Sequence, residues 1–236
     1  MNHNLEMYQQ NIEQFLVFKK KLNRFMMYYK FGMDELETKI NILNQEFQYV
    51  HDYNPIEHVS SRLKTPESVL KKIRRKGYSI DLEVIRENIK DIAGIRINCS
   101  FVSDIYRIAA MLAQQSDMEV IEYKDYIENP KPNGYQSLHL LIQIPVFMSD
   151  RTEKVYVEVQ LRTIAMDFWA SLEHKIYYKH HEGLIVPQKL QDDLKEAAMA
   201  ITLLDQKMEE IHKEMEQLKI ENYQSEFVQK RENNEF

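Results

Sequence analysis

The sequence predicts an α+β protein with a mixed β-sheet of about five strands flanked by helices, and with long helices at both ends. Apolar residues recur at steps of three and four near both ends of the chain, which is the period of an amphipathic helix. Between these ends, short β-branched segments alternate with helical ones, and the last two strand-like segments are close enough to form a hairpin. Such a mixture is typical of the α+β class.

The chain has 236 residues, which suits one large domain or two small ones. We expect a single domain over residues 1–222, followed by a polar tail over 223–236. Within the domain we expect an N-terminal helical region over 1–50, a central core over 54–180 and a C-terminal helix over 188–222.

The N-terminal region predicts one long helix, with an apolar series that only Lys19 interrupts. The series is Leu5, Tyr8, Ile12, Phe15, Leu22, Met26, Tyr29, Met33, Leu36, Ile40, Leu43, Phe47 and Val50. An unbroken helix over 5–50 would be about 69 Å long at 1.5 Å per residue, which exceeds a domain of this size. We therefore expect either a break near Gly32 or a helix that projects from the domain.

The C-terminal region has the same period. Its apolar series is Leu190, Leu194, Ala197, Ile201, Leu204, Met208, Ile211, Met215 and Leu218. Such a seam needs a covering surface, because each buried Leu or Ile stabilises by about 1.5 to 3 kcal/mol. A second copy of the chain can provide that surface. The alternative is that the two terminal helices pack only on each other within one chain.

The middle of the chain predicts alternating strands and helices. Thr65 can cap a helix that has Pro66 at its first position and ends at Gly77. A loop with two prolines covers 129–134. Strands are expected at 92–101, 120–126, 137–146 and 154–161, and further helices at 103–115 and 164–178.

Composition excludes several classes of function. The formal net charge of −6 argues against a nucleic acid as partner. No apolar run reaches the roughly 18 to 20 residues of a membrane span, so we expect no membrane partner. The single cysteine, Cys99, excludes an intrachain disulfide, and we expect a cytoplasmic protein. The five glycines are too dispersed for a Walker A or GxGxxG loop, so side chains must hold any nucleotide.

A local group of cations stands out in this acidic chain. Its members lie on or just before the helix that starts at Pro66: Arg62, Lys64, Lys72 and Arg75, with Ser68 between them. Ser68, Lys72 and Arg75 have i, i+4, i+7 spacing, which places a hydroxyl and two cations on one helix face. This group is a candidate phosphate site. Charge alone favours the simpler alternative, a solvated basic helix face.

Two carboxylates lie at strand positions. Asp91 directly precedes the strand that starts at Ile92, and Glu158 lies inside a β-branched strand where glutamate is uncommon. Carboxylates from neighbouring strands can hold Mg²⁺, which also binds nucleotide phosphates. The alternative for Glu158 is an edge-strand side chain that faces water.

The segment from Gly134 to His139 enters a strand after the proline-rich loop. Tyr135, Ser137 and His139 alternate with other residues and are expected on one face. An exposed tyrosine there can stack on a base, and His139 can reach a phosphate or a sugar. The alternative is a tyrosine that packs on its own loop.

Three segments combine these candidate residues: Asp91-Ile-Ala-Gly-Ile-Arg96, Lys131-Pro-Asn-Gly-Tyr135-Gln-Ser-Leu-His139 and Glu158-Val-Gln-Leu-Arg162-Thr. Taken together, they resemble the synthetase motifs of RelA/SpoT-type alarmone synthetases. Two more, Trp169-Ala-Ser-Leu-Glu173-His174 and Tyr177-Tyr-Lys179, resemble the small, stand-alone enzymes of that family. The resemblance covers residues 54 to 205 approximately, and it implies a nucleotidyltransferase-like synthetase fold.

The resemblance implies a reaction in which the β,γ-pyrophosphate of ATP moves to the 3′-hydroxyl of GDP or GTP. The products are ppGpp or pppGpp, and AMP. By motif position, the implied ATP-binding residues are Arg62 and Arg96 around adenine, and Lys64, Ser68, Lys72 and Arg75 at the phosphates. The implied residues for GDP or GTP are Tyr135, stacked on guanine, and Lys131, His139 and Gln160. Asp91 and Glu158 are the implied catalytic Mg²⁺ ligands, and Glu158 also takes the 3′-hydroxyl proton.

The resemblance also implies an assembly, because small alarmone synthetases form homotetramers. In one branch of them, product binds between subunits through basic residues on the helix before the segment that matches Asn54-Pro55-Ile56-Glu57. This chain has Asn41 and Asn44 where those cations are expected, and His58 in place of an aromatic residue. We therefore expect no strong activation by product.

Two other functions fit parts of the sequence. The long heptad helices suit an inactive coiled-coil module that only senses guanine nucleotides. A related nucleotidyltransferase acting on RNA ends is the other alternative. The first is disfavoured because both candidate carboxylates and all the donor-site cations are present, and the second because the net charge is −6.

Overall fold

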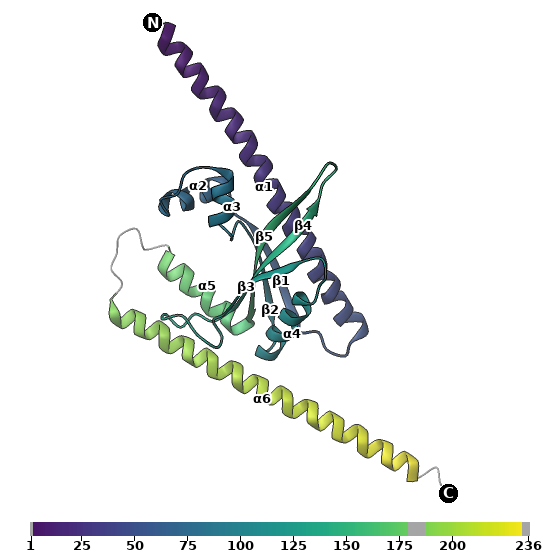
Figure 1. Cartoon of the computed structure of the whole chain (residues 1–236). Helices are drawn as coiled ribbons and strands as arrows, with labels where there is room; N and C mark the ends of the chain where they lie inside the picture. Colours follow the sequence, from purple (N-terminus) through teal and green to yellow (C-terminus); the bar gives the residue numbers. More distant parts are fainter. Residues whose placement is uncertain (1, 179–186, 233–236) are drawn as a thin grey trace.

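The computed structural model describes residues 2–178 and 187–232, and it confirms the α+β class (Figure 1). The five strands are β1 (Ile56–Leu63), β2 (Ala93–Cys99), β3 (Glu119–Asp125), β4 (Leu138–Phe147) and β5 (Thr152–Thr163). The helices are α1 (Asn2–Val50), α2 (Pro66–Arg75), α3 (Leu82–Asn88), α4 (Val102–Ala113), α5 (Ile164–Tyr178) and α6 (Gln188–Glu232). The strand order is β1-β2-β5-β4-β3, and only the β2–β5 pair is parallel. The expected hairpin is β4–β5.

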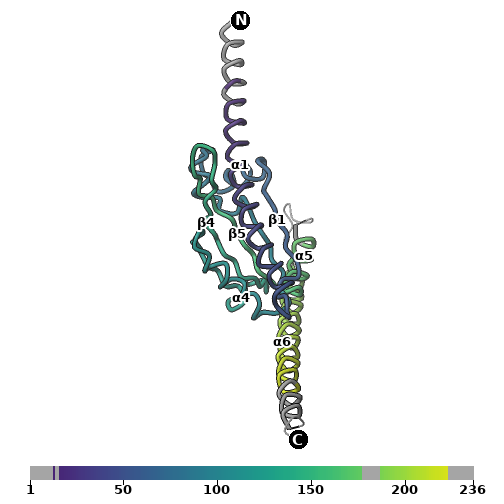
Figure 2. Tube along the Cα trace, turned by 90° about the vertical axis from the view of Figure 1, so that its right-hand side faces the viewer, coloured from purple at the N-terminus to yellow at the C-terminus, as the bar shows by residue number. Residues whose placement is uncertain are grey.

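Helix α1 is continuous, so the expected break near Gly32 is wrong and the projecting alternative is correct. Its middle part packs on the sheet, where Leu36 and Ile40 are fully buried. Gly32 permits this close approach, because a Cβ there would lie 2.2 Å from Cγ2 of Val155. Figure 2 shows the helix running along the sheet and continuing beyond it, and Leu16 and Val17 are accordingly exposed.

The central strands have two different faces. On β2 and β5, alternate residues are buried and apolar, among them Ile95, Ile97, Val157 and Val159, and they share one core with α1 and α4. The residues between them are only partly buried and mostly polar, and they face away from this core. The sheet therefore has an apolar side covered by helices and a polar side that can hold ligands.

Helix α6 packs on α5 and α4, whereas α1 packs on the sheet. The alternative in which the terminal helices pack only on each other is therefore wrong. A small cluster of Trp169, Ala170 and Ala198 joins α5 to α6. Figures 1 and 2 show the N-terminal part of α1 and the C-terminal part of α6 projecting in opposite directions.

Three features differ from the sequence-based expectation. Strand β1 and the seven-residue helix α3 were not expected, and α6 continues to Glu232 through the segment expected as a polar tail. Strand β1 is an edge strand that reads Ile-Glu-His-Val-Ser-Ser-Arg-Leu, with little apolar alternation. Its pairing with β2 comes from backbone hydrogen bonds that composition does not reveal. Among the described residues, no helix is long and apolar enough to span a membrane.

Candidate active site

The polar side of the sheet contains two cavities that share Asp91 and Glu158. One, of about 290 Å³, lies over β1, β2 and β5 and is lined by Arg62, Lys64, Asp91, Arg96, Glu158 and Gln160 among others. The other, of about 310 Å³, is lined on its far side by Lys72, Lys131, Tyr126 and His139 among others. Two carboxylates thus lie between two sites, each of which has its own cations.

Asp91 is held by two lysines of the predicted phosphate group. Its Oδ2 lies 2.6 Å from Nζ of Lys72 and 3.1 Å from Nζ of Lys64. Burial acts to raise the pKa of Asp91, but the hydrogen bond and charge of Lys72 and the charge of Lys64 outweigh it, so its pKa is lowered. The Oδ1 atom is buried and has no hydrogen-bond partner among the described residues. An ionised carboxylate with one unused oxygen can coordinate a cation.

Glu158 lies on the same face of β5 as Gln160, because side chains alternate along a strand. Its Oε2 accepts a hydrogen bond of 2.8 Å from Nε2 of Gln160, and its Oε1 lies 3.7 Å from Nδ1 of His139. Burial acts to raise the pKa of Glu158, but its interactions with His139 and Gln160 outweigh burial and lower the pKa. Strand β5 lies between β2 and β4 and the side chain is 29% exposed, so the alternative of an edge-strand glutamate that faces water is wrong.

Tyr135, which precedes β4, contacts His139, which lies in β4. The Tyr135 hydroxyl lies 2.7 Å from Nε2 of His139, and Nζ of Lys131 lies 4.6 Å from the Tyr135 ring centre. Burial is the main cause that lowers the pKa of Lys131. Ser137 was expected on the same face, but it is fully buried and donates to the carbonyl of Leu161.

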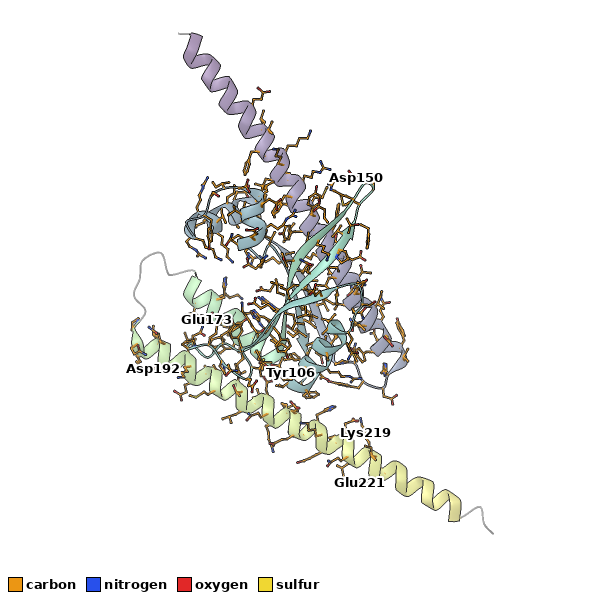
Figure 3. All side chains as sticks on the ribbon, viewed as in Figure 1. Tyr106, Asp150, Glu173, Asp192, Lys219 and Glu221 are labelled. Atoms are coloured by element: carbon orange, nitrogen blue, oxygen red, sulfur yellow. The ribbon has the colours of Figure 1, made fainter. Side chains whose placement is uncertain are left out.

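The loop that carries Tyr135 is held by the two C-terminal helices. Gly134 has a φ of +89°, and a Cβ there would lie 2.5 Å from Cβ of Ala198 on α6. Asn133 donates a hydrogen bond of 3.2 Å to Glu173, which lies on α5 and is labelled in Figure 3. Gln136 accepts one of 2.8 Å from Thr202 of α6. The position of the tyrosine therefore depends on α5 and α6.

Two residues of the predicted phosphate group do not line either cavity. Ser68 and Arg75 are exposed on α2, and the Ser68 hydroxyl accepts a hydrogen bond from Thr65, the residue that caps this helix. Gln160, assigned to the guanine nucleotide, lines the first cavity and not the second. Of the other predicted residues, Arg62, Lys64 and Arg96 line the first cavity, and Lys72, Lys131 and His139 line the second. Tyr135 lines neither cavity and contacts Lys131 and His139.

Sequence reasoning missed Tyr126, Arg162 and Asp167. Tyr126 lines the second cavity, with its ring centre 4.5 Å from Nζ of Lys131. Arg162 is almost completely buried and forms an ion pair of 2.9 Å with Asp167. An arginine inside a strand that packs on a core was the available signal, because a buried charge requires a partner.

Comparison with known proteins shows which family this chain resembles. Residues 61–183 match the model described as the region found in RelA / SpoT proteins. The chain is 52% identical over 191 residues to the GTP pyrophosphokinase YwaC of Bacillus subtilis, which covers 81% of this chain and 90% of that protein. It is 39% identical over 198 residues to the GTP pyrophosphokinase YjbM of the same organism, covering 84% and 92%.

Solved structures give the same result for the fold. The crystal structure of small alarmone synthetase 2 from B. subtilis superimposes with a TM-score of 0.72 at 52% identity, covering 80% of this chain and 96% of that one. Small alarmone synthetase 1 from B. subtilis, bound to its product pppGpp, gives 0.75 at 37% identity, covering 84% and 99%. With the two cavities and their shared carboxylates, these matches establish that the chain belongs to the RelA/SpoT family, as a small alarmone synthetase.

Proposed function

We propose that this protein is a (p)ppGpp synthetase that transfers the β,γ-pyrophosphate of ATP to the 3′-hydroxyl of GDP or GTP and releases AMP. The observation that carries the proposal is the pair of cavities that meet at Asp91 and Glu158. A transfer between two nucleotides requires donor and acceptor in adjacent sites, with negative charge neutralised where they meet. Both substrates are intracellular nucleotides, so we place the reaction in the cytoplasm.

The first cavity suits the donor. Arg62 and Arg96 come from the adjacent strands β1 and β2, and guanidinium groups can stack on a flat base. Lys64 lies on the same side, and Lys72 approaches Asp91 from α2. We assign these lysines, together with the exposed Ser68 and Arg75 of α2, to the ATP phosphates.

The second cavity suits the acceptor. Lys131 and His139 line it, and we assign them to the ribose and phosphates of the acceptor. We assign guanine stacking to Tyr135, which contacts both of these residues next to the cavity. Gln160 reaches the same region through its hydrogen bond with Glu158. Side chains therefore perform the task that a glycine-rich loop performs in other nucleotide-binding folds.

Asp91 and Glu158 are also the residues proposed to bind Mg²⁺. The partnerless, buried Oδ1 of Asp91 and the lowered pKa values of both carboxyls fit a hard divalent cation. Two protein carboxylates suffice, because Mg²⁺ takes most of its other ligands from water and substrate phosphates. When bound, the ion neutralises phosphate charge and polarises the bridging oxygen of the donor.

Glu158 is the proposed general base. It accepts the proton of the 3′-hydroxyl as that oxygen forms a bond to the β-phosphorus of ATP. The bond between the β-phosphorus and the α,β-bridging oxygen breaks, and AMP leaves with that oxygen. A ribose hydroxyl is a weak nucleophile, so a base within hydrogen-bond reach is required.

Incubation with ATP labelled on its γ-phosphate, with GDP and with Mg²⁺ tests the proposal. The expected products are a guanosine nucleotide that carries the label and unlabelled AMP. Binding of guanine nucleotide without any product would favour a sensing module, and transfer to RNA ends alone would favour a nucleotidyltransferase. Omission of Mg²⁺ should abolish the labelled product.

Replacement of Tyr135 by alanine should weaken the binding of the guanine nucleotide much more than the binding of ATP. Base–aromatic stacking contributes about 1 to 3 kcal/mol, so KM for GDP should rise by about fivefold or more. Separate titration of each substrate measures the effect. Tyr123→Ala, at an exposed tyrosine of β3, is the matched control and should change neither KM. Equal rises in KM for GDP and for ATP would indicate that Tyr135 has a structural role instead.

Added pppGpp should not strongly stimulate the enzyme. Asn41 and Asn44 have no positive charge, and Oδ1 of Asn44 is occupied by a hydrogen bond of 2.7 Å from Asn54. An anionic nucleotide has therefore little to bind at this part of α1. Initial rates with and without added pppGpp measure this, and a clear acceleration would contradict the placement of these asparagines.

We also propose that the protein is a homo-oligomer, and specifically a tetramer. Within one chain, six residues of the predicted C-terminal seam are between 42% and 54% exposed: Leu190, Leu204, Met208, Ile211, Met215 and Leu218. They lie on one flank of α6, beside the face that packs on α5. Figure 3 shows Lys219 and Glu221 where this helix extends away from the sheet. A second copy is the simplest cover for a continuous apolar stripe.

A further inference from the structure

One carboxylate on α5 contacts side chains from two neighbouring strands. Oδ1 of Asp167 lies 3.0 Å from Nη1 of Arg96 on β2 and 2.9 Å from Nη1 of Arg162 on β5. Its Oδ2 accepts a hydrogen bond of 3.1 Å from Asn98, which is paired with Arg162 in the sheet. Three donors therefore converge on this side chain, which itself does not line either cavity.

Arg162 extends these contacts to the acceptor side. Its Nη2 donates to the hydroxyl of Tyr135 at 2.6 Å and to Oε1 of Gln160 at 3.0 Å. The side chain is only 6% exposed, so its geometry is fixed by these partners and by Asp167. A guanidinium can only donate, so the phenolic oxygen of Tyr135 accepts from it. The Tyr135 hydrogen is then free to be donated to Nε2 of His139.

The position of Asp167 is fixed by the start of α5. Thr163 is the last residue of β5, and its hydroxyl accepts a hydrogen bond of 3.0 Å from the backbone N–H of Met166. The same hydroxyl donates to the buried Asp205 of α6 at 2.7 Å. The chain thus passes from the strand that carries Glu158 directly into a capped helix, and Asp167 lies in the first turn of that helix.

We propose that Asp167 is a positioning residue that orients the adenine-binding Arg96 and, through Arg162, the guanine-binding Tyr135. The proposal rests on the proposed function, because it uses the roles of Arg96 and Tyr135 given there. One carboxylate pairs with two neighbouring guanidinium groups and reduces the repulsion between them. Donor and acceptor sites are then aligned by the same group, at a distance from the reacting atoms.

The proposal predicts different effects for two variants. Asp167→Asn removes the charge that holds both arginines, so KM should rise for ATP and for GDP. Arg162→Lys keeps the ion pair between Arg96 and Asp167 but loses the two hydrogen bonds from the guanidinium to Tyr135 and Gln160. Only KM for GDP should therefore rise. Each rise should be about tenfold or more, which corresponds to the loss of one hydrogen bond to a charged group. At saturating substrates kcat should fall much less, because Glu158 is unchanged.

Asp104→Asn is the matched control for burial, because this aspartate of α4 is 5% exposed and accepts hydrogen bonds from Tyr53 and from the backbone N–H of Phe101, away from Asp167 and both arginines. Thermal unfolding of each variant shows whether it is folded. Binding of GDP and of a non-transferable ATP analogue, each titrated alone, gives affinities without turnover. If Asp167→Asn were too unstable to study, Asp167→Glu would replace it, because the longer side chain keeps the charge but displaces the contacts with both arginines, and KM for both nucleotides should again rise.

Elevated KM values for both nucleotides in Asp167→Asn, and for GDP alone in Arg162→Lys, would support the proposal. A folded Asp167→Asn protein with a lower kcat and unchanged KM values would overturn it, because that pattern indicates a structural role. An Asp167→Asn protein with unchanged affinity for the ATP analogue would also overturn the proposal. Absence of product with the wild-type protein would instead refute the proposed function, and the binding titrations keep these two failures distinct.

Discussion

Replacement of Glu158 by glutamine should lower kcat by at least about 10²-fold, which is the low end of the contribution of a general base. Glutamine has nearly the same shape and can keep the hydrogen-bond network with Gln160. It cannot accept the 3′-hydroxyl proton, and it is a poorer ligand for Mg²⁺. The loss should therefore appear in kcat more than in the affinity for either nucleotide, and initial rates at saturating ATP and GDP measure it.

The matched control for this variant is Glu153→Gln. Glu153 lies on the same strand, with its carboxylate 2.9 Å from Arg151 and 3.5 Å from Arg86, and it lines neither cavity. The control should retain its turnover, and both variants should have the circular dichroism and oligomeric mass of the wild type. A Glu158→Gln protein with near-normal turnover would remove Glu158 from the proton transfer.

The elements of the fold were predictable where local signals are strong. Thr65 and Pro66 start α2 as expected, because a side-chain cap and a proline at the first position act within one turn. Helix α5 covers Ile164–Tyr178, as its apolar pattern indicated. Strand β1 was missed because its residues are mostly polar, and only its pairing with β2 makes it a strand.

The sequence motifs named candidate site residues but did not predict how these residues are arranged. The motifs identified Asp91, Glu158 and Tyr135, and their roles stay predictions. Helical spacing placed Ser68, Lys72 and Arg75 on one face, yet of these only Lys72 reaches the shared carboxylates. Spacing cannot show where the end of a helix lies relative to a sheet. The contacts of Asp167 join β2, β5 and α5, so they depend on the parallel β2–β5 register, which no local pattern encodes.

The proposed assembly would explain why the two long helices differ in burial. Helix α1 buries its seam against the sheet, as Leu36 and Ile40 show, whereas α6 leaves Leu204 and Ile211 exposed at 54% and 42%. Helix α6 also supports the loop of Tyr135 through Ala198 and Thr202. An interface on α6 would therefore also stabilise the helix that holds the proposed guanine site.

Replacement of both Leu204 and Ile211 by aspartate should break the proposed tetramer into smaller species. Each substitution places an unpaired charge in an apolar interface, where desolvation costs several kcal/mol per ion. Because a symmetric assembly repeats every contact, the effect applies to each subunit at once. Light scattering should give about four times the chain mass of 28.4 kDa for the wild type, and the mass of one or two chains for the variant.

The control is the pair Gln206→Asp and Gln217→Asp, which adds the same negative charge to the same helix. Both glutamines are exposed, and their spacing places them on the side of α6 opposite the seam. This control should keep the wild-type mass, so a change that occurs only in the seam variant would locate the interface. A wild-type mass near that of a single chain at micromolar concentration would refute the assembly. Loss of GDP affinity in the dissociated variant would connect the interface to the loop of Tyr135.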